Sequence, residues 1–205
     1  MNLFDQVVLL ATGLVAVFLI WRLFQHFQNT NQPMYDVYYI GAFAVLFVAG
    51  VLLIVLSYNV LASPLVVIFA ALIPAGLSLG LVSEFNSKNE RAYLIFLVVG
   101  LLALAITRLA MPGMIATIVL IIVHTVAGLI IFGLPILVTQ QKKAPQGFVF
   151  VTIGGALIGI GGLALAALKI GAPILPAEFI FLILAPLLLL MTLSFTYGFI
   201  AKIKA

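Results

Sequence analysis

Charged residues are scarce in this chain of 205 residues, and cysteine is absent altogether. Only 7% of the residues are charged, nine basic and five acidic, whereas 66% are hydrophobic. A soluble domain usually has about a quarter of its residues charged, because its surface must face water. The scarcity excludes a soluble enzyme, a nucleic-acid-binding protein and a disordered chain, and it predicts an integral membrane protein. The lack of cysteine excludes disulfides, thiolate metal sites and thiol catalysis.

Long apolar segments occupy most of the chain. A helix needs roughly 20 apolar residues to cross the hydrocarbon core of a bilayer, and seven segments satisfy this requirement. They are continuously apolar rather than alternating, which favours helices over the strands of a β-barrel. We therefore predict one all-α transmembrane domain over residues 1–205, a bundle of seven helices. The predicted spans are 6–27, 35–57, 62–83, 92–109, 113–139, 147–170 and 176–200.

The basic residues predict the orientation of the bundle. Basic side chains are enriched on the cytoplasmic side of membrane proteins. With an external N-terminus, only Arg108 and Lys169 lie outside. We therefore expect a multi-pass protein of the plasma or inner membrane with a cytoplasmic C-terminus. The basic residues placed inside are Arg22, Lys88, Arg91, Lys142, Lys143, Lys202 and Lys204.

The ends of the spans hold most of the remaining polar side chains. We expect Glu84, Arg108, Lys169 and Glu178 to reach the headgroups or to cap helices, and Lys169 to pair with Glu178 on the outer side. Aromatic residues near the inner ends are expected to anchor the helices at the membrane interface. These residues are Trp21, Tyr35, Tyr38 and Tyr39.

Two spans share a proline pattern. The third span opens at Pro64 and has a second proline, Pro74, ten residues on. The seventh span repeats this pattern 112 residues later with Pro176 and Pro186. The same offset aligns Ile68 with Ile180, Phe69 with Phe181, Leu72 with Leu184 and Gly50 with Gly162. This pattern is consistent with a parallel 3+1+3 repeat, in which the fourth span connects two halves. Apolar helices built from few residue types also match by chance, and the sequence leaves both interpretations open.

His124 is the one titratable residue expected near the middle of the membrane. Ionisable groups at that depth are candidate functional residues. One interpretation is a neutral imidazole that donates to a carbonyl of a neighbouring helix. The other is a cofactor-binding residue, a single axial ligand of a haem or chlorophyll, because His26 lies too far along the membrane normal to be a second ligand. No bound cofactor is predicted from the sequence.

The sixth span contains small residues at four-residue spacing, which allow helix backbones to approach closely. We expect a tight helix–helix interface there, and the alternative is a bare face that admits a flat pigment, a quinone or a lipid tail. The residues concerned are Gly154, Gly155, Gly159 and Gly162.

The sequence argues against an enzyme. The letters Gly76-Leu77-Ser78-Leu79-Gly80 match a nucleophile elbow, but they lie within a predicted helix rather than at a strand–turn–helix junction. The five carboxylates lie mostly at span ends and do not converge on one site.

Two non-enzymatic functions remain. The first is a small transporter or channel for a neutral or lipid-like solute, whose path runs between the third and seventh spans. The alternative is an accessory subunit of a respiratory or photosynthetic complex that holds lipid, quinone or pigment. The expected partners are the lipid bilayer and either other transmembrane subunits or further copies of the chain. The residues expected along the path are Pro74, Ser78, Thr125 and Pro186, with His124 nearby.

Overall fold

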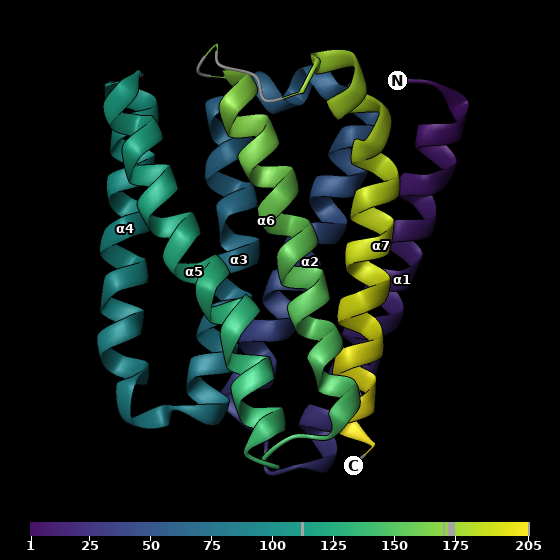
Figure 1. Ribbon diagram of the computed structural model, residues 1–205, viewed down its shortest axis with the longest axis vertical. Helices are drawn as coiled ribbons and strands as arrows, with labels where there is room; N and C mark the ends of the chain where they lie inside the picture. Colours follow the sequence, from purple (N-terminus) through teal and green to yellow (C-terminus); the bar gives the residue numbers. More distant parts are fainter. Residues whose placement is uncertain (112, 170, 172–174, 205) are drawn as a thin grey trace.

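The computed structural model describes residues 1–111, 113–169, 171 and 175–204. Within them the chain is all-helical, and seven of the helices are long and apolar enough to cross a membrane, as the sequence predicts (Figure 1). The seven helices are α1 (Leu3–Asn29), α2 (Met34–Leu56), α3 (Pro64–Phe85), α4 (Glu90–Ala110), α5 (Met114–Gln140), α6 (Phe150–Lys169) and α7 (Ala177–Ile203). Three short 3-10 helices join them: η1 (Tyr58–Ala62), η2 (Ser87–Asn89) and η3 (Gln146–Val149).

Local chemistry explains where several helices begin. The side chain of Asn2 accepts a hydrogen bond of 2.8 Å from the Asp5 amide, and the Asp5 carboxylate accepts one of 3.1 Å from the Asn2 amide. This reciprocal cap satisfies amides that the first turn of α1 leaves free. Pro64 begins α3, where its missing amide hydrogen removes no helical bond. Gly113 precedes α5 with a φ of 137°, a conformation that favours glycine.

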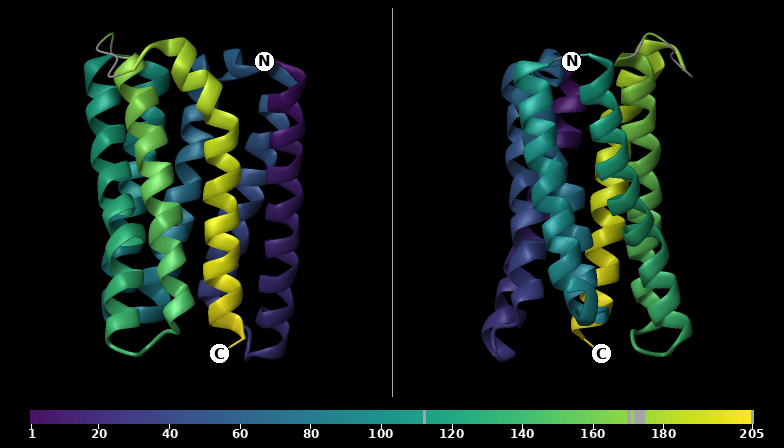
Figure 2. Two further views of the ribbon diagram at one scale, coloured as in Figure 1. Left: turned by 45° about the vertical axis from the view of Figure 1, so that its right-hand side comes forward. Right: turned by 90° about the vertical axis from the view of Figure 1, so that its left-hand side faces the viewer.

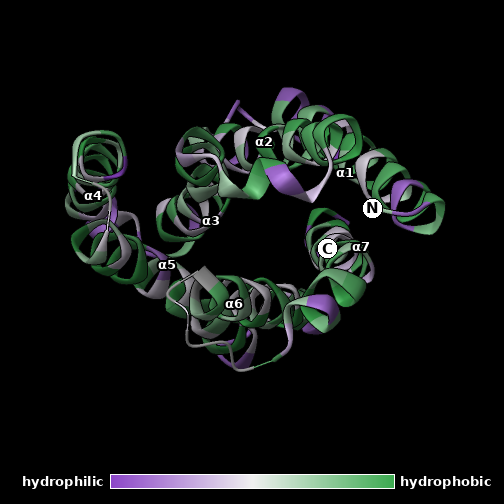
Figure 3. Ribbon diagram, turned by 90° about the horizontal axis from the view of Figure 1, so that it is seen from above, coloured by the Kyte–Doolittle hydropathy of each residue, from purple (hydrophilic) through white to green (hydrophobic). Residues whose placement is uncertain are grey.

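The helices stand roughly side by side, and the two termini lie at opposite ends of the bundle (Figures 1 and 2). We call these the N-terminal end and the C-terminal end. Each helix packs against the next in the chain, α3 also contacts α5, and α7 returns to contact α1. Six helices therefore form a ring, and α4 packs outside it against α3 and α5 (Figure 3).

Aromatic side chains fill the ring near its C-terminal end. Tyr39, Phe43, Phe148, Phe195 and Phe199 are all fully buried, and they belong to one core cluster. Their rings pack at centroid distances between 4.5 Å, for the Tyr39–Phe199 pair, and 5.9 Å. Dense packing of this kind fills the centre of the ring at this end with described side chains.

The glycines of α6 differ in how closely they are packed. A Cβ atom added at Gly154 would lie 2.6 Å from the ring of Phe195 on α7. One added at Gly155 would lie 2.7 Å from the Cγ2 atom of Ile131 on α5 and 3.2 Å from its backbone carbonyl carbon. At Gly159 no heavy atom lies within 4 Å, so the packing contact expected there is not found. Close approach of backbones is therefore a property of the first half of α6, at the C-terminal end of the bundle.

Replacing Gly155 by alanine tests this packing. The added methyl group meets both the side chain and the backbone of Ile131, so the Gly155→Ala variant should lose about 1–3 kcal/mol of stability. Gly159→Ala is the matched control, because the same methyl group enters open space on the same helix. Thermal unfolding in a mild detergent should show a lower midpoint for Gly155→Ala only. Equal midpoints for the two variants would contradict the close α5–α6 contact.

Candidate functional site

A cavity of about 490 Å³ lies in the N-terminal half of the bundle. Side chains of α3, α5 and α6 form its walls, η1 covers its N-terminal end, and α4 and α7 each contribute a residue to the described lining. Its volume is within the range of about 300–1,000 Å³ that small-molecule sites occupy. Most of the lining is aliphatic, so the cavity suits a largely apolar ligand.

Polar side chains line this cavity at two levels. Tyr58, Asn59, Arg108 and Thr117 lie towards the N-terminal end, whereas His124 and Thr125 lie deeper. Seven residues of α5 separate Thr117 from His124, a rise of about 10 Å along the helix. The wall between the two levels is aliphatic, and Val66, Val67, Leu120, Ile121 and Leu163 contribute to it.

Tyr58 forms part of the cover of the cavity. Its ring stacks on Phe181 of α7, with centroids 5.3 Å apart and an interplanar angle of 19°. Burial and the nearby Asp5 carboxylate raise the pKa of Tyr58 to about 12. The phenol is therefore neutral at physiological pH and presents a hydroxyl group rather than a charge.

Arg108, like Tyr39 and Glu84, is a span-end residue that neighbouring helices enclose. It was expected to reach the headgroups from the end of α4, but only 7% of it is exposed and it lines the cavity. Its Nε atom is buried and has no hydrogen-bond partner, and its guanidinium forms no salt bridge with any described residue. No acidic side chain is found in the described lining. The side chain of Lys169, expected to pair with Glu178, lies outside the described residues.

His124 lies at the deep end of the cavity, against α6. A Cβ atom at Gly162 would be 2.8 Å from the Nε2 atom of His124, so the absence of a side chain at Gly162 makes room for the imidazole. The imidazole makes no hydrogen bond to any residue that the structure describes. No cluster of three or more potential metal ligands occurs in the described part of the chain.

The residues expected along a path between α3 and α7 do not lie together. His124 and Thr125 line the cavity, but Pro74, Ser78 and Pro186 are not part of its described lining. Ser78 is fully buried, donates to the Pro74 carbonyl at 2.6 Å and accepts from the Tyr93 hydroxyl of α4 at 2.7 Å. The cavity instead lies mainly between α3, α5 and α6.

Pro74 still affects the cavity indirectly. A proline inside a helix removes the amide that would bond to the carbonyl four residues earlier. For Pro74 that carbonyl belongs to Ala70, which lines the cavity. The proline therefore leaves a backbone acceptor without its helical donor in the cavity wall.

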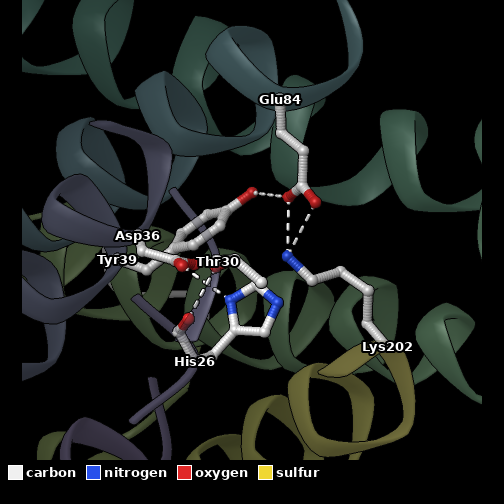
Figure 4. Close-up of polar contacts among 6 residues, drawn as sticks. All are labelled: His26, Thr30, Asp36, Tyr39, Glu84 and Lys202. Carbon is white, nitrogen blue, oxygen red and sulfur yellow. Dashed lines mark hydrogen bonds and ion pairs between the residues drawn. The ribbon is translucent and has the colours of Figure 1, made fainter. Parts of the chain in front are cut away.

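An ion pair closes the C-terminal end of the ring (Figure 4). The Nζ atom of Lys202 on α7 donates to both carboxylate oxygens of Glu84 on α3, at 2.8 Å each. The hydroxyl group of Tyr39 on α2 donates to the same carboxylate at 2.9 Å. The side chains of Lys202 and Glu84 are only 8% and 13% exposed. Tyr39, expected as an interfacial anchor, is instead fully buried in this network.

Aromatic rings surround the Lys202 ammonium group. Its Nζ atom lies 5.1 Å from the ring centroids of Tyr35 and Tyr39, 5.7 Å from that of Phe199 and 6.0 Å from that of Phe148. Cations at such distances are attracted by the faces of aromatic rings. The ammonium group is therefore held by a carboxylate and by the aromatic core at once.

A second polar pair joins α1 to α2 at the same end. The Nδ1 atom of His26 lies 2.6 Å from the Oδ2 atom of Asp36, which is fully buried (Figure 4). Thr30 donates to the backbone carbonyl of His26 at 2.6 Å. The sequence gives no indication of the His26–Asp36 and Glu84–Lys202 pairs, because the two members of each pair lie on different helices.

The Lys202→Met substitution tests how strongly the ion pair closes this end. It leaves the Glu84 carboxylate buried without its cation, and removing one partner of a buried pair costs about 3–5 kcal/mol. The thermal midpoint should fall, and it should recover in part when Glu84→Gln is added, because the uncompensated charge is then removed. Lys204→Met, at an exposed position two residues on, is the control and should leave the midpoint unchanged. A similar loss in both single variants would contradict the role of Lys202.

Comparison with known proteins gives no family for this chain: no protein-family model, no curated protein and no solved structure matches it.

Proposed function

We propose that this chain is a transporter or channel of the plasma or inner membrane that takes up a small lipid-like or neutral solute. The observation that carries the proposal is an apolar cavity between the helices in the N-terminal half of the bundle. The cavity is apolar, whereas the opposite end is filled by aromatic rings and closed by the Glu84–Lys202 pair. In each of its alternating states, a carrier closes the route from its solute site to one side of the membrane. The closed C-terminal end is the arrangement expected of one such state.

The surface of the bundle supports its insertion in a membrane. Exposed positions on every long helix hold large apolar side chains, among them Leu14, Val51, Leu65, Val99 and Leu129. A surface of this kind is stable in lipid and not in water. The basic residues gather at the C-terminal end, which supports a cytoplasmic C-terminus and an external N-terminus.

The helix positions support the parallel 3+1+3 repeat. The spans that begin at Met114, Gln146 and Ala177 start within one residue of the positions 112 after Leu3, Met34 and Pro64. Around the ring, the contact between α3 and α5 corresponds to the contact between α7 and α1. In the second span of each half, the same positions are buried: Asp36, Tyr39, Ala42 and Phe43 correspond to Phe148, Val151, Gly154 and Gly155.

The two halves suggest how the solute would move. The cavity lies where α3 of the first half faces α5 and α6 of the second. The Glu84–Lys202 pair links the first half to the second at the C-terminal end. Opening towards the cytoplasm would therefore require this pair to break while the N-terminal end closes on the emptied cavity.

The charged groups favour a non-enzymatic role. The carboxylates of Asp5, Asp36, Glu84 and Glu90 each contact a neighbouring polar side chain or capped amide, and none lines the cavity. A substrate in the cavity would meet no acid or nucleophile among the described residues other than His124 and hydroxyl groups.

An accessory subunit of a larger complex is the second candidate. The observation in its favour is α4, which packs mainly on α3 and α5 and turns a broad apolar face outward. In that role the cavity would hold a lipid, a quinone or a pigment permanently. The exposed residues of this face include Ile95, Val98, Val99, Leu102, Ile106 and Leu109.

Single cysteines test the orientation, because the chain contains no other cysteine. Gln141→Cys, at an exposed position beside Lys142, should resist a membrane-impermeant thiol reagent added to intact cells. Met111→Cys, at the opposite end, should react with it, since this residue is 53% exposed. The reverse pattern would overturn the proposed orientation.

Lipid movement in vesicles tests transport. Purified protein in liposomes should speed the exchange of a fluorescent single-chain lysophosphatidylcholine between leaflets, measured as the fraction that dithionite can bleach. Ala70→Phe fills the cavity and should return the rate to that of protein-free vesicles. Ala92→Phe is the matched control, because Ala92 is an exposed residue of α4 outside the described lining.

Two results would contradict the transport proposal. One is a wild-type rate equal to that of protein-free vesicles, and the other is an unchanged rate in Ala70→Phe. Release from the membrane only together with fixed partner chains or a coloured cofactor would favour the accessory subunit instead.

A further inference from the structure

The cavity contains one permanent positive charge and no described acidic group to balance it. Arg108 is the only permanently charged side chain in the described lining, and 7% of the residue is exposed. Its Nε atom is buried without a hydrogen-bond partner. By contrast, Lys202 at the other end of the bundle has both a carboxylate and four aromatic rings around it.

A guanidinium whose buried Nε atom has no partner among the described residues is unfavourable. A buried charge costs several kilocalories per mole unless a counter-charge and hydrogen bonds compensate for it. Charged residues within membrane spans therefore usually mark binding sites or paths for polar groups. Since the described residues do not supply the counter-charge, a ligand is its natural source.

We propose that the cavity binds a single-chain amphiphile whose anionic headgroup, a carboxylate or a phosphate, pairs with Arg108. Its apolar chain then extends towards His124. This inference rests on the proposed function in one respect, since it takes the cavity as the solute site. It adds the chemical class of the solute, an anion with one apolar chain.

The position of Arg108 fits an amphiphile that lies along the membrane normal. Arg108 is two residues from the end of α4, a distance of about 3 Å along the helix, so it lies near the N-terminal end of the cavity, whereas His124 lies deeper. Asn59 lines the same part of the cavity and offers a further donor for a carboxylate or phosphate. Below them the walls are aliphatic down to His124, as an alkyl chain requires.

The geometry of arginine suits this role. The planar guanidinium can donate two parallel hydrogen bonds to a carboxylate or a phosphate, and such charge-assisted pairs are the strongest in proteins. A neutral solute of the same chain length would gain the apolar contacts but leave the charge unpaired. The cavity should therefore prefer the anion over the matched neutral compound.

Native mass spectrometry of the whole protein in a neutral detergent tests this preference. The probes are dodecanoate, dodecyl phosphate and dodecanol, which share one chain, and inorganic phosphate, which has none. Wild-type protein should retain the two anionic amphiphiles at lower concentrations than dodecanol, and inorganic phosphate alone should give no adduct. In Arg108→Met the affinity for both anions should fall about tenfold or more, as expected for the loss of a charge-assisted pair.

Two further variants locate the effect. Arg108→Lys should restore part of the preference, because it keeps the charge but not the planar donor pair. Arg91→Met removes an exposed arginine from the opposite end of α4 and should bind all probes like the wild type. Dodecanol should be retained equally by all four proteins.

The stability of the ligand-free protein separates binding from a structural role. If Arg108 serves a ligand, ligand-free Arg108→Met should unfold at a temperature equal to or above that of the wild type, because an uncompensated buried charge is removed. A lower midpoint would show that Arg108 stabilises the fold, and it would overturn the inference.

The remaining outcomes distinguish the inference from the proposed function. Equal retention of anionic and neutral chains by the wild type would overturn the anion preference and leave the cavity as a solute site. Retention of none of the three chains would overturn both. An adduct of inorganic phosphate that depends on Arg108 and excludes the chains would overturn the amphiphile and indicate a free phosphate site.

Discussion

The ion pair between Glu84 and Lys202 is the interaction on which the asymmetry of the bundle depends. It joins α3 to α7 across the ring, and the Tyr39 hydroxyl adds α2 to the same contact. In a membrane protein the apolar surface drives little association between helices, because lipid is as apolar as the core. A buried, hydrogen-bonded charge pair then constrains how the helices pack. Separating the two side chains would leave each charge in an apolar surrounding. The aromatic core around Lys202 makes the C-terminal end the closed end of the structure.

The N-terminal end has the opposite character. Its buried charge, Arg108, has no partner among the described residues, and the nearby space is open rather than filled. A charge in a low-dielectric surrounding requires compensation. This rule has different consequences at the two ends of the bundle. At one end the chain supplies the compensation and the structure is closed. At the other end we propose that a solute supplies it.

The sequence predicts the helices well and the contacts between them poorly. Seven helices could be predicted because a helix is the simple way to satisfy the backbone in lipid, and its length follows from the bilayer. Glu84 and Lys202 lie 118 residues apart, and nothing in either segment indicates that they meet. Position along a span also failed to predict burial: Tyr39 and Arg108 both occur near helix ends, yet both are enclosed by neighbouring helices. Among the α6 glycines, spacing alone could not separate Gly155 from Gly159, because only the partner helix distinguishes them.

Under the proposed repeat, the positions at which the two halves differ explain more about the packing and the cavity than the positions at which they agree. The buried positions Asp36 and Tyr39 of α2 correspond to Phe148 and Val151, so the polar network of the first half has apolar counterparts in the second. Ala42 and Phe43 correspond to Gly154 and Gly155, which let α6 approach Phe195 and Ile131 closely at the C-terminal end. Farther along α6, Gly162 gives room to His124 instead, and the cavity opens there. Thus α6 packs closely at the C-terminal end, and at the N-terminal end its glycine leaves room for the His124 side chain. Together these features place the cavity between the proposed halves, near the N-terminal end.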